Sequence, residues 1–114
     1  MSAFPQFFQE KRQDLVFLCQ KYQVLRLYVF GSVLTDRFNE KSDIDFLVSF
    51  DQIPLLDYAD YFFDFIYALE KLFARKIDLL TEKSLSNPYL IQSINRHKQL
   101  LYDRKNQVNQ LLEQ

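Results

Sequence analysis

The chain has 114 residues and 48% hydrophobic residues, which fits a single domain with a sizeable core. Aromatic residues make up 17%, which excludes intrinsic disorder and leaves rings to spare for a contact with another chain. The formal net charge of −1 without a basic run argues against direct nucleic-acid binding, and the apolar runs are too short to cross a membrane.

Residues 6–22 follow Pro5 and carry apolar side chains at helical spacing, which predicts an amphipathic helix. Cys19 lies beside the apolar stripe of this helix, where we expect it to be a small buried hydrophobe. As the only cysteine it has no partner for an internal disulfide, and the first residues do not resemble a signal peptide. We therefore expect a soluble protein of the reducing cytoplasm.

Two strands are predicted around the only glycine of the chain, Gly31. Residues 24–30 alternate as a strand with Leu25, Leu27 and Val29 on one face, and Gly31 ends that strand. Residues 43–50 form the clearest strand: Ile44, Phe46, Val48 and Phe50 point one way, and Asp43, Asp45, Leu47 and Ser49 point the other way. The carboxylates of Asp43 and Asp45 therefore share a face.

The second half of the chain predicts two helices and two short strands. A long helix over residues 57–74 has one charged and two apolar stripes, which indicates either deep burial or a contact surface. Residues 75–80 form a strand on which Asp78 faces away from the apolar side, and Asn87 followed by Pro88 begins a helix that ends near residues 96–98. Residues 99–102 form a last strand.

This order of elements predicts an α+β fold in which helices pack on one face of a small mixed sheet. We expect a domain over residues 1–103 and a polar tail, a frayed helix, over residues 104–114. The other face of the sheet would then carry Asp43, Asp45 and Asp78.

Carboxylates this close repel each other unless a cation lies between them. A small number of hard oxygen ligands favours magnesium, and Asp78 as a third carboxylate would complete a site for two metal ions that act on a phosphoryl group. The alternative left open by Asp43 and Asp45 alone is the solvated face of an amphipathic strand.

Gly31 and Ser32 favour the metal site. A glycine that follows a strand and begins a short turn lets a phosphate approach the backbone, and the turn amides and the Ser32 hydroxyl can bind its oxygens. A Gly-Ser pair alone is an ordinary turn, but here it would place a phosphate beside the paired aspartates.

The Gly-Ser pair, the spacer over residues 33–42 and the run Asp-Ile-Asp-Phe-Leu-Val resemble the signature of the DNA polymerase beta type nucleotidyltransferase superfamily. The small size, the Lys-Ile-Asp-Leu-Leu run at Asp78 and the C-terminal part are similar to its minimal nucleotidyltransferases. The resemblance implies that Gly31 and Ser32 bind the triphosphate of ATP, and that Asp43, Asp45 and Asp78 are the catalytic ligands of Mg²⁺. It leaves open whether Arg37 replaces a phosphate contact that many relatives make.

The resemblance also implies a function. Minimal nucleotidyltransferases are often paired with helical HEPN toxins, and members of the family transfer AMP from ATP to a tyrosine of the toxin, so we expect an adenylyltransferase antitoxin that assembles with such a partner or with copies of itself. Two alternatives remain: a catalytically silent antitoxin that neutralises its toxin by binding, and a small-molecule nucleotidyltransferase completed by a partner chain. His97 and Lys98 are interpreted as cations in the last turn of a helix.

Overall fold

A mixed four-stranded sheet forms the centre of the molecule in the computed structural model, which describes residues 6–105. The strand order is β3-β2-β1-β4, with β1 antiparallel to β2 and β4, and β2 parallel to β3. The strands are β1 (Val24–Phe30), β2 (Ile44–Phe50), β3 (Ile77–Thr81) and β4 (Gln99–Asp103). The predicted α+β class and mixed sheet are confirmed.

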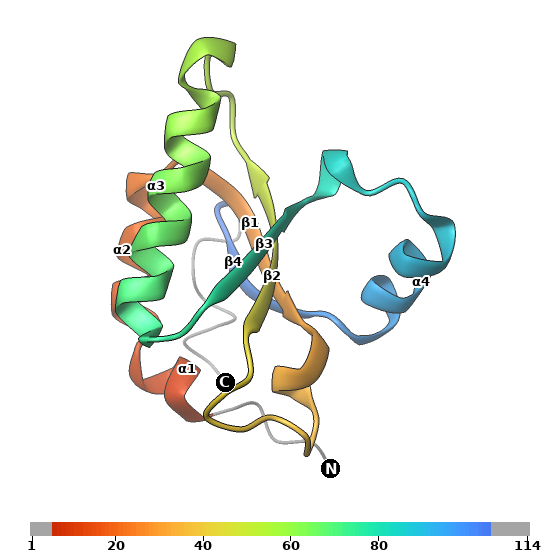
Figure 1. Cartoon of the computed structure of the whole chain (residues 1–114). Helices are drawn as coiled ribbons and strands as arrows, with labels where there is room; N and C mark the ends of the chain where they lie inside the picture. Colours follow the sequence, from red (N-terminus) through yellow and green to blue (C-terminus); the bar gives the residue numbers. More distant parts are fainter. Residues whose placement is uncertain (1–5, 106–114) are drawn as a thin grey trace.

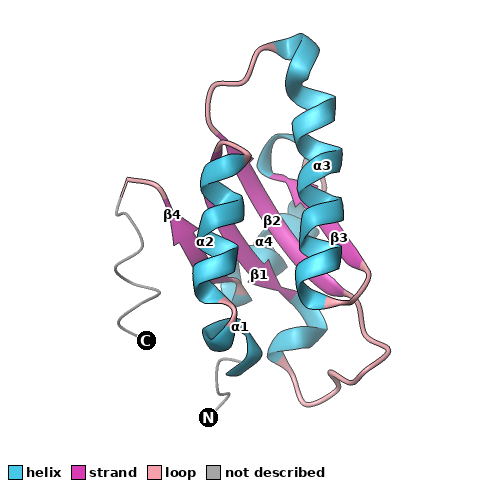
Figure 2. Cartoon of the chain, turned by 90° about the vertical axis from the view of Figure 1, so that its left-hand side faces the viewer, coloured by secondary structure: helices cyan, strands magenta, loops and turns pink. Residues whose placement is uncertain are grey.

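The helices lie on both sides of this sheet. They are α1 (Gln6–Glu10), α2 (Arg12–Lys21), α3 (Leu55–Phe73) and α4 (Pro88–His97), with short 3₁₀ helices η1 (Gly31–Leu34) and η2 (Glu82–Ser84). Helices α2 and α3 cover one face, and α3 is the crossover that parallel strands need (Figure 2). Helices α2 and α3 lie on one face of the sheet, as expected. Helix α4 lies on the opposite side of the sheet (Figure 1).

The main core lies between the sheet and the α2–α3 layer. Phe8, Phe46 and Phe73 form a ring cluster with centroids 5.3 to 6.2 Å apart. Leu47 and Ile94 are also buried but lie outside this core cluster, as expected for the sheet face on the α4 side. Both faces of the sheet are therefore partly covered, one by α2 and α3 and the other by α4.

Two local predictions need correction. The single helix over residues 6–22 is interrupted at Lys11, and the separate α1 carries the fully buried Phe8 into the ring cluster. A bulge between Val24 and Arg26 buries Val24 in place of Leu25, because an extra residue in one strand shifts the alternation of its side chains.

Other predictions are confirmed. Cys19 is fully buried, and burial raises the pKa of its thiol well above the ordinary value. The side chain of Asn87 accepts hydrogen bonds from the N–H groups of Tyr89 and Leu90, so it caps α4 as expected. Most of the expected tail lies outside the described residues. Within residues 6–105, no helix is both long enough and apolar enough for a membrane crossing.

Candidate active site

Asp45 and Asp78 lie side by side on the two parallel strands. They are register partners in the pairing of β2 with β3, and the N–H of Ile44 donates to the carbonyl of Lys76 at 3.1 Å just before them. Because Ile44 and Phe46 point into the main core, the alternation of the strand turns Asp45 to the opposite, α4-side face. The structure therefore brings together two carboxylates that are 33 residues apart in the sequence.

The electrostatics of Asp45 show how close these groups are. Its pKa is raised from 3.8 to about 6, first by burial, then by the negative charges of Asp78 and Asp43, and by a side-chain hydrogen bond with Asp78. Asp43 is exposed and precedes the first residue of β2, so strand pairing does not fix its side chain. The charges of the other two predicted aspartates thus both reach Asp45.

Gly31 lies directly against the carboxylate of Asp45. Its φ of +83° is a left-handed conformation, and a β-carbon there would meet the carboxylate of Asp45, at 3.2 Å from its Cγ and closer still to Oδ2. The turn that Gly31 begins is η1, in which the Thr35 hydroxyl donates to the Ser32 carbonyl at 2.8 Å. The predicted phosphate-binding turn and the aspartates are therefore in direct contact.

Arg75 positions the loop that joins η1 to β2, a role that sequence reasoning missed. Its guanidinium donates to the carbonyls of Asn39 at 2.7 Å and Ser42 at 2.9 Å, and it lies 4.3 Å from the ring centre of Phe38. It thereby links the start of β3 to the residues just before Asp43. A lone basic residue before a strand carries no sequence signal for this contact.

A cavity of about 620 Å³ adjoins η1. Its lining comes from the end of β1, from η1 and the residues after it, and from α4. This volume is within the roughly 300–1,000 Å³ typical of small-ligand sites. A larger cavity of about 920 Å³ lies toward the other end of β2 and contains none of the three aspartates. The contribution of α4 to the smaller cavity was not predicted from the sequence.

The carboxylates suit a hard divalent cation, but their present arrangement is only partly that of a metal site. Asp45 and Asp78 are close enough to raise the pKa of Asp45, but Asp43 is exposed. No group of three or more His, Cys, Asp or Glu side chains within residues 6–105 is already placed to hold a metal ion. The donor chemistry fits Mg²⁺, because oxygen ligands are those it prefers and a cation would offset the repulsion that raises the pKa of Asp45.

A glycine-made turn against paired aspartates on a mixed sheet is the arrangement of a nucleotidyltransferase, and the family comparison agrees. The model of the nucleotidyltransferase domain family matches residues 12–101. The chain belongs to this family.

Its relatives include small members. A Methanocaldococcus jannaschii protein named "Putative protein adenylyltransferase MJ1379" is 39% identical over 83 residues, which cover 73% of this chain and 82% of the relative. A solved structure described as a "putative minimal nucleotidyltransferase" is 32% identical, with a TM-score of 0.65, and the match covers 82% of this chain and 92% of that chain. The predicted likeness to minimal nucleotidyltransferases is confirmed.

A more distant likeness concerns the fold alone. The complex of a tri-AMPylated Shewanella oneidensis HEPN toxin with its MNT antitoxin contains a chain that is 18% identical, with a TM-score of 0.58. The match covers 91% of this chain and 79% of that chain. The same sheet and helix arrangement therefore occurs in a toxin–antitoxin assembly.

Proposed function

We propose that this nucleotidyltransferase is a magnesium-dependent protein adenylyltransferase that moves AMP from ATP to a hydroxyl, of the tyrosine type, on a partner of the HEPN toxin class. The observation that carries the proposal is the register pairing of Asp45 with Asp78 directly against Gly31. It would place a phosphate-binding turn, a set of metal ligands and an acceptor position within one small volume.

In the proposed reaction, the acceptor oxygen attacks the α-phosphorus of ATP and forms a new P–O bond. The bond between the α-phosphorus and the oxygen that bridges to the β-phosphate breaks, and pyrophosphate leaves with that electron pair. The acceptor hydroxyl loses its proton, and the exposed Asp78 would accept it. Asp43, Asp45 and Asp78 would hold Mg²⁺, which would neutralise phosphate charge.

The chain's own residues hold the substrate. Gly31 lets the turn lie directly against the Asp45 carboxylate, and the turn amides and the hydroxyl of the half-buried Ser32 would bind the phosphate oxygens. Arg75 holds the loop between η1 and β2, and this loop leads directly into Asp43, the residue before β2. Because most of the rate would come from positioning, small displacements of these elements should cost activity.

A protein acceptor must reach the α4 side of the sheet, because Asp45 faces that side. Two large apolar side chains of α4 are exposed there, Tyr89 at 82% and Leu90 at 43%. The exposed Phe17, Phe63 and Tyr67 belong to α2 and α3, across the sheet from the aspartates. We therefore assign docking of the acceptor to α4, and the MJ1379 relative and the HEPN–MNT complex support a protein as the acceptor.

The experiment is transfer of label from α-labelled ATP, in the presence of magnesium, to a purified helical partner of the HEPN toxin class. Label should appear on that partner with the wild-type chain and disappear with the double variant Asp43→Asn/Asp45→Asn. A partner that stays unlabelled in an otherwise well-formed complex would overturn the proposal and leave a binding-only antitoxin.

A further inference from the structure

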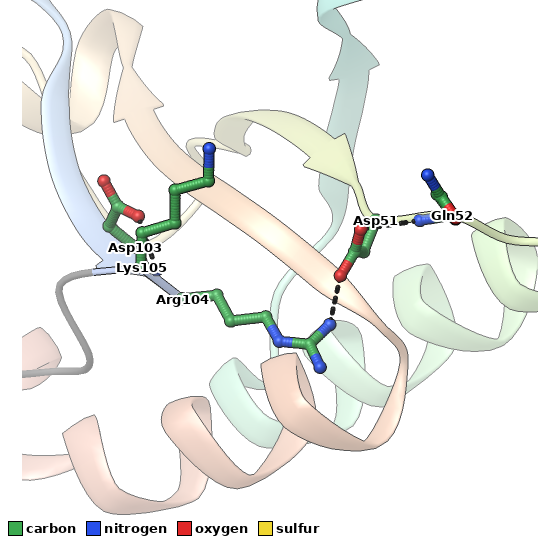
Figure 3. Close-up of polar contacts among 5 residues, drawn as sticks. All are labelled: Asp51, Gln52, Asp103, Arg104 and Lys105. Atoms are coloured by element: carbon green, nitrogen blue, oxygen red, sulfur yellow. Dashed lines mark hydrogen bonds and ion pairs between the residues drawn. The ribbon is translucent and has the colours of Figure 1, made fainter.

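Two arginines of the chain stand apart from the others in their contacts. The chain has six arginines. Arg26 pairs with Glu82, Arg75 donates to two carbonyls, Arg12 donates to Gln9, and Arg104 pairs with Asp51 across the ends of β4 and β2 (Figure 3). Within residues 6–105, the guanidinium groups of the remaining two, Arg37 and Arg96, have no hydrogen-bond or ion-pair partner.

These two arginines come from distant parts of the sequence but line the same cavity. Arg37 follows η1 and Arg96 lies in the last turn of α4, and both contribute to the wall of the 620 Å³ cavity beside Gly31 and Ser32. Both side chains are exposed rather than packed under other residues. Their shared location is not explained by any contact that stabilises the fold.

The rest of the lining has the character of a site for an anion. No aspartate or glutamate lines this cavity, and Asp36, although it precedes Arg37, is not part of the wall. The other polar members are hydroxyl, imidazole and amide side chains: Ser32, Thr35, Ser93, His97 and Gln99. Asp45 contacts Gly31 but does not itself line the cavity.

We propose that Arg37 and Arg96 bind the β- and γ-phosphates of the nucleoside triphosphate in this cavity, so that α4 forms one wall of the nucleotide site. This inference rests on the proposed function and assigns two residues to it. Guanidinium groups bind phosphate oxygens through paired, charge-assisted hydrogen bonds. When the bond to the α-phosphorus breaks, negative charge grows on the departing pyrophosphate, and both cations then stabilise it.

The two sets of residues would have separate tasks. The aspartates would act at the α-phosphate, and the arginines would hold the part of the substrate that leaves. Lys98, just after α4, lies 4.1 Å from the ring centre of Tyr28 on β1, which fixes the end of α4 against the sheet. Arg96 is thereby kept near the cavity by the helix that carries it.

The test is calorimetric binding of ATP, inorganic pyrophosphate and AMP to the full chain in magnesium buffer. Arg37→Gln and Arg96→Gln should each weaken binding of ATP and pyrophosphate by about tenfold or more, because each removes a charge-assisted hydrogen bond to a phosphate. Binding of AMP, which lacks both outer phosphates, should be unchanged. Arg96→Lys should restore part of the affinity, and Arg12→Gln on α2, across the sheet, is the matched control that should change none of the three.

The outcomes separate this inference from the proposed function. Wild-type affinity for ATP and pyrophosphate in both Gln variants would overturn the role of the arginines, and the transfer activity could still stand. Selective loss in the variants supports the inference. If that loss is found for pyrophosphate while the wild type labels no partner, the anion site stands and the proposed transfer fails.

Discussion

Gly31 and Asp45 are in contact because residue 31 has no side chain. A β-carbon at Gly31 would lie 3.2 Å from Cγ of Asp45 and closer still to its Oδ2. The turn proposed to bind phosphate and the carboxylate of Asp45 thus occupy adjoining space, which only glycine allows at a φ of +83°.

Gly31→Ala should therefore abolish most activity. The new methyl group must displace the carboxylate of Asp45 or the turn, and misplacement by about 1 Å costs on the order of 100-fold in rate. The left-handed backbone adds roughly 1–2 kcal/mol of destabilisation. The measurements are the rate of transfer and the free energy of unfolding. Ser32→Ala removes a hydroxyl without adding an atom near Asp45, so it should leave stability unchanged, and an equal loss of stability in both variants would contradict this explanation.

Asp45 should make the fold less stable as the pH rises. Its pKa in the folded state is about 6, mainly through burial, compared with 3.8 as the ordinary value. Between these values the folded state holds a proton that the unfolded state has lost, so stability falls as the pH increases from about 4 to about 6 and stays low above that. Asp45→Asn removes this dependence and should be more stable than the wild type at pH 7.5 without divalent ions.

The measurement is denaturant unfolding of both proteins at pH 4 and pH 7.5. The advantage of Asp45→Asn should shrink at the lower pH. Asp36→Asn changes an exposed carboxylate near η1 and serves as the control. If the stability of Asp45→Asn and of the wild type depends on pH in the same way, the claim that burial and neighbouring carboxylates raise the pKa of Asp45 is wrong.

Ala74 is a second left-handed residue, and it ends α3. Its φ is 54° and ψ is 41°, a conformation in which a β-carbon is unfavourable. Ala74→Gly should stabilise the fold by about 1 kcal/mol, since the left-handed strain of roughly 1–2 kcal/mol exceeds the entropy cost of glycine. Thermal unfolding measures this directly. Ala59→Gly, in the first half of the same helix, is the control and should destabilise the fold by a similar amount.

Tyr89 should matter for a protein acceptor and not for the nucleotide. It is 82% exposed on α4 and does not line the cavity. Tyr89→Ser should slow transfer to the partner about tenfold by loss of an aromatic contact, while the affinity for ATP stays the same. Phe63→Ser, on α3 across the sheet, removes an exposed ring of similar size and should leave transfer unchanged. Slower transfer with Phe63→Ser and unchanged transfer with Tyr89→Ser would contradict this and would assign docking to the α2–α3 side.

Much of this fold follows from patterns in the sequence. The alternation over residues 43–50 predicts both the core face of β2 and the outward direction of Asp45, and the Asn-Pro pair predicts the start of α4. The bulge in β1 and the break at Lys11 could not be predicted, because both depend on how distant side chains pack.

The residues of the candidate site were likewise only partly predictable from the sequence. Asp43, Asp45, Asp78, Gly31 and Ser32 follow from spacing and from the family resemblance, and the structure pairs Asp45 with Asp78 and sets Asp45 against Gly31. Arg75 and Arg96 carry no local pattern, since a basic residue before a strand or at a helix end has an ordinary structural explanation. Only the folded structure shows that Arg75 donates to the loop before β2 and that Arg96 lines the cavity beside η1.

The central claim is that Asp43, Asp45 and Asp78 act together as the metal-binding catalytic group, and the most direct test is the rate of AMP transfer as a function of Mg²⁺ concentration. The wild type should saturate with Mg²⁺ and stop when the metal is chelated. Each single Asp→Asn variant should lose about 100-fold or more of this rate, as expected for removal of a ligand that neutralises charge in the transition state. Transfer at the wild-type rate by Asp45→Asn, or by the wild type without divalent metal, would contradict the account.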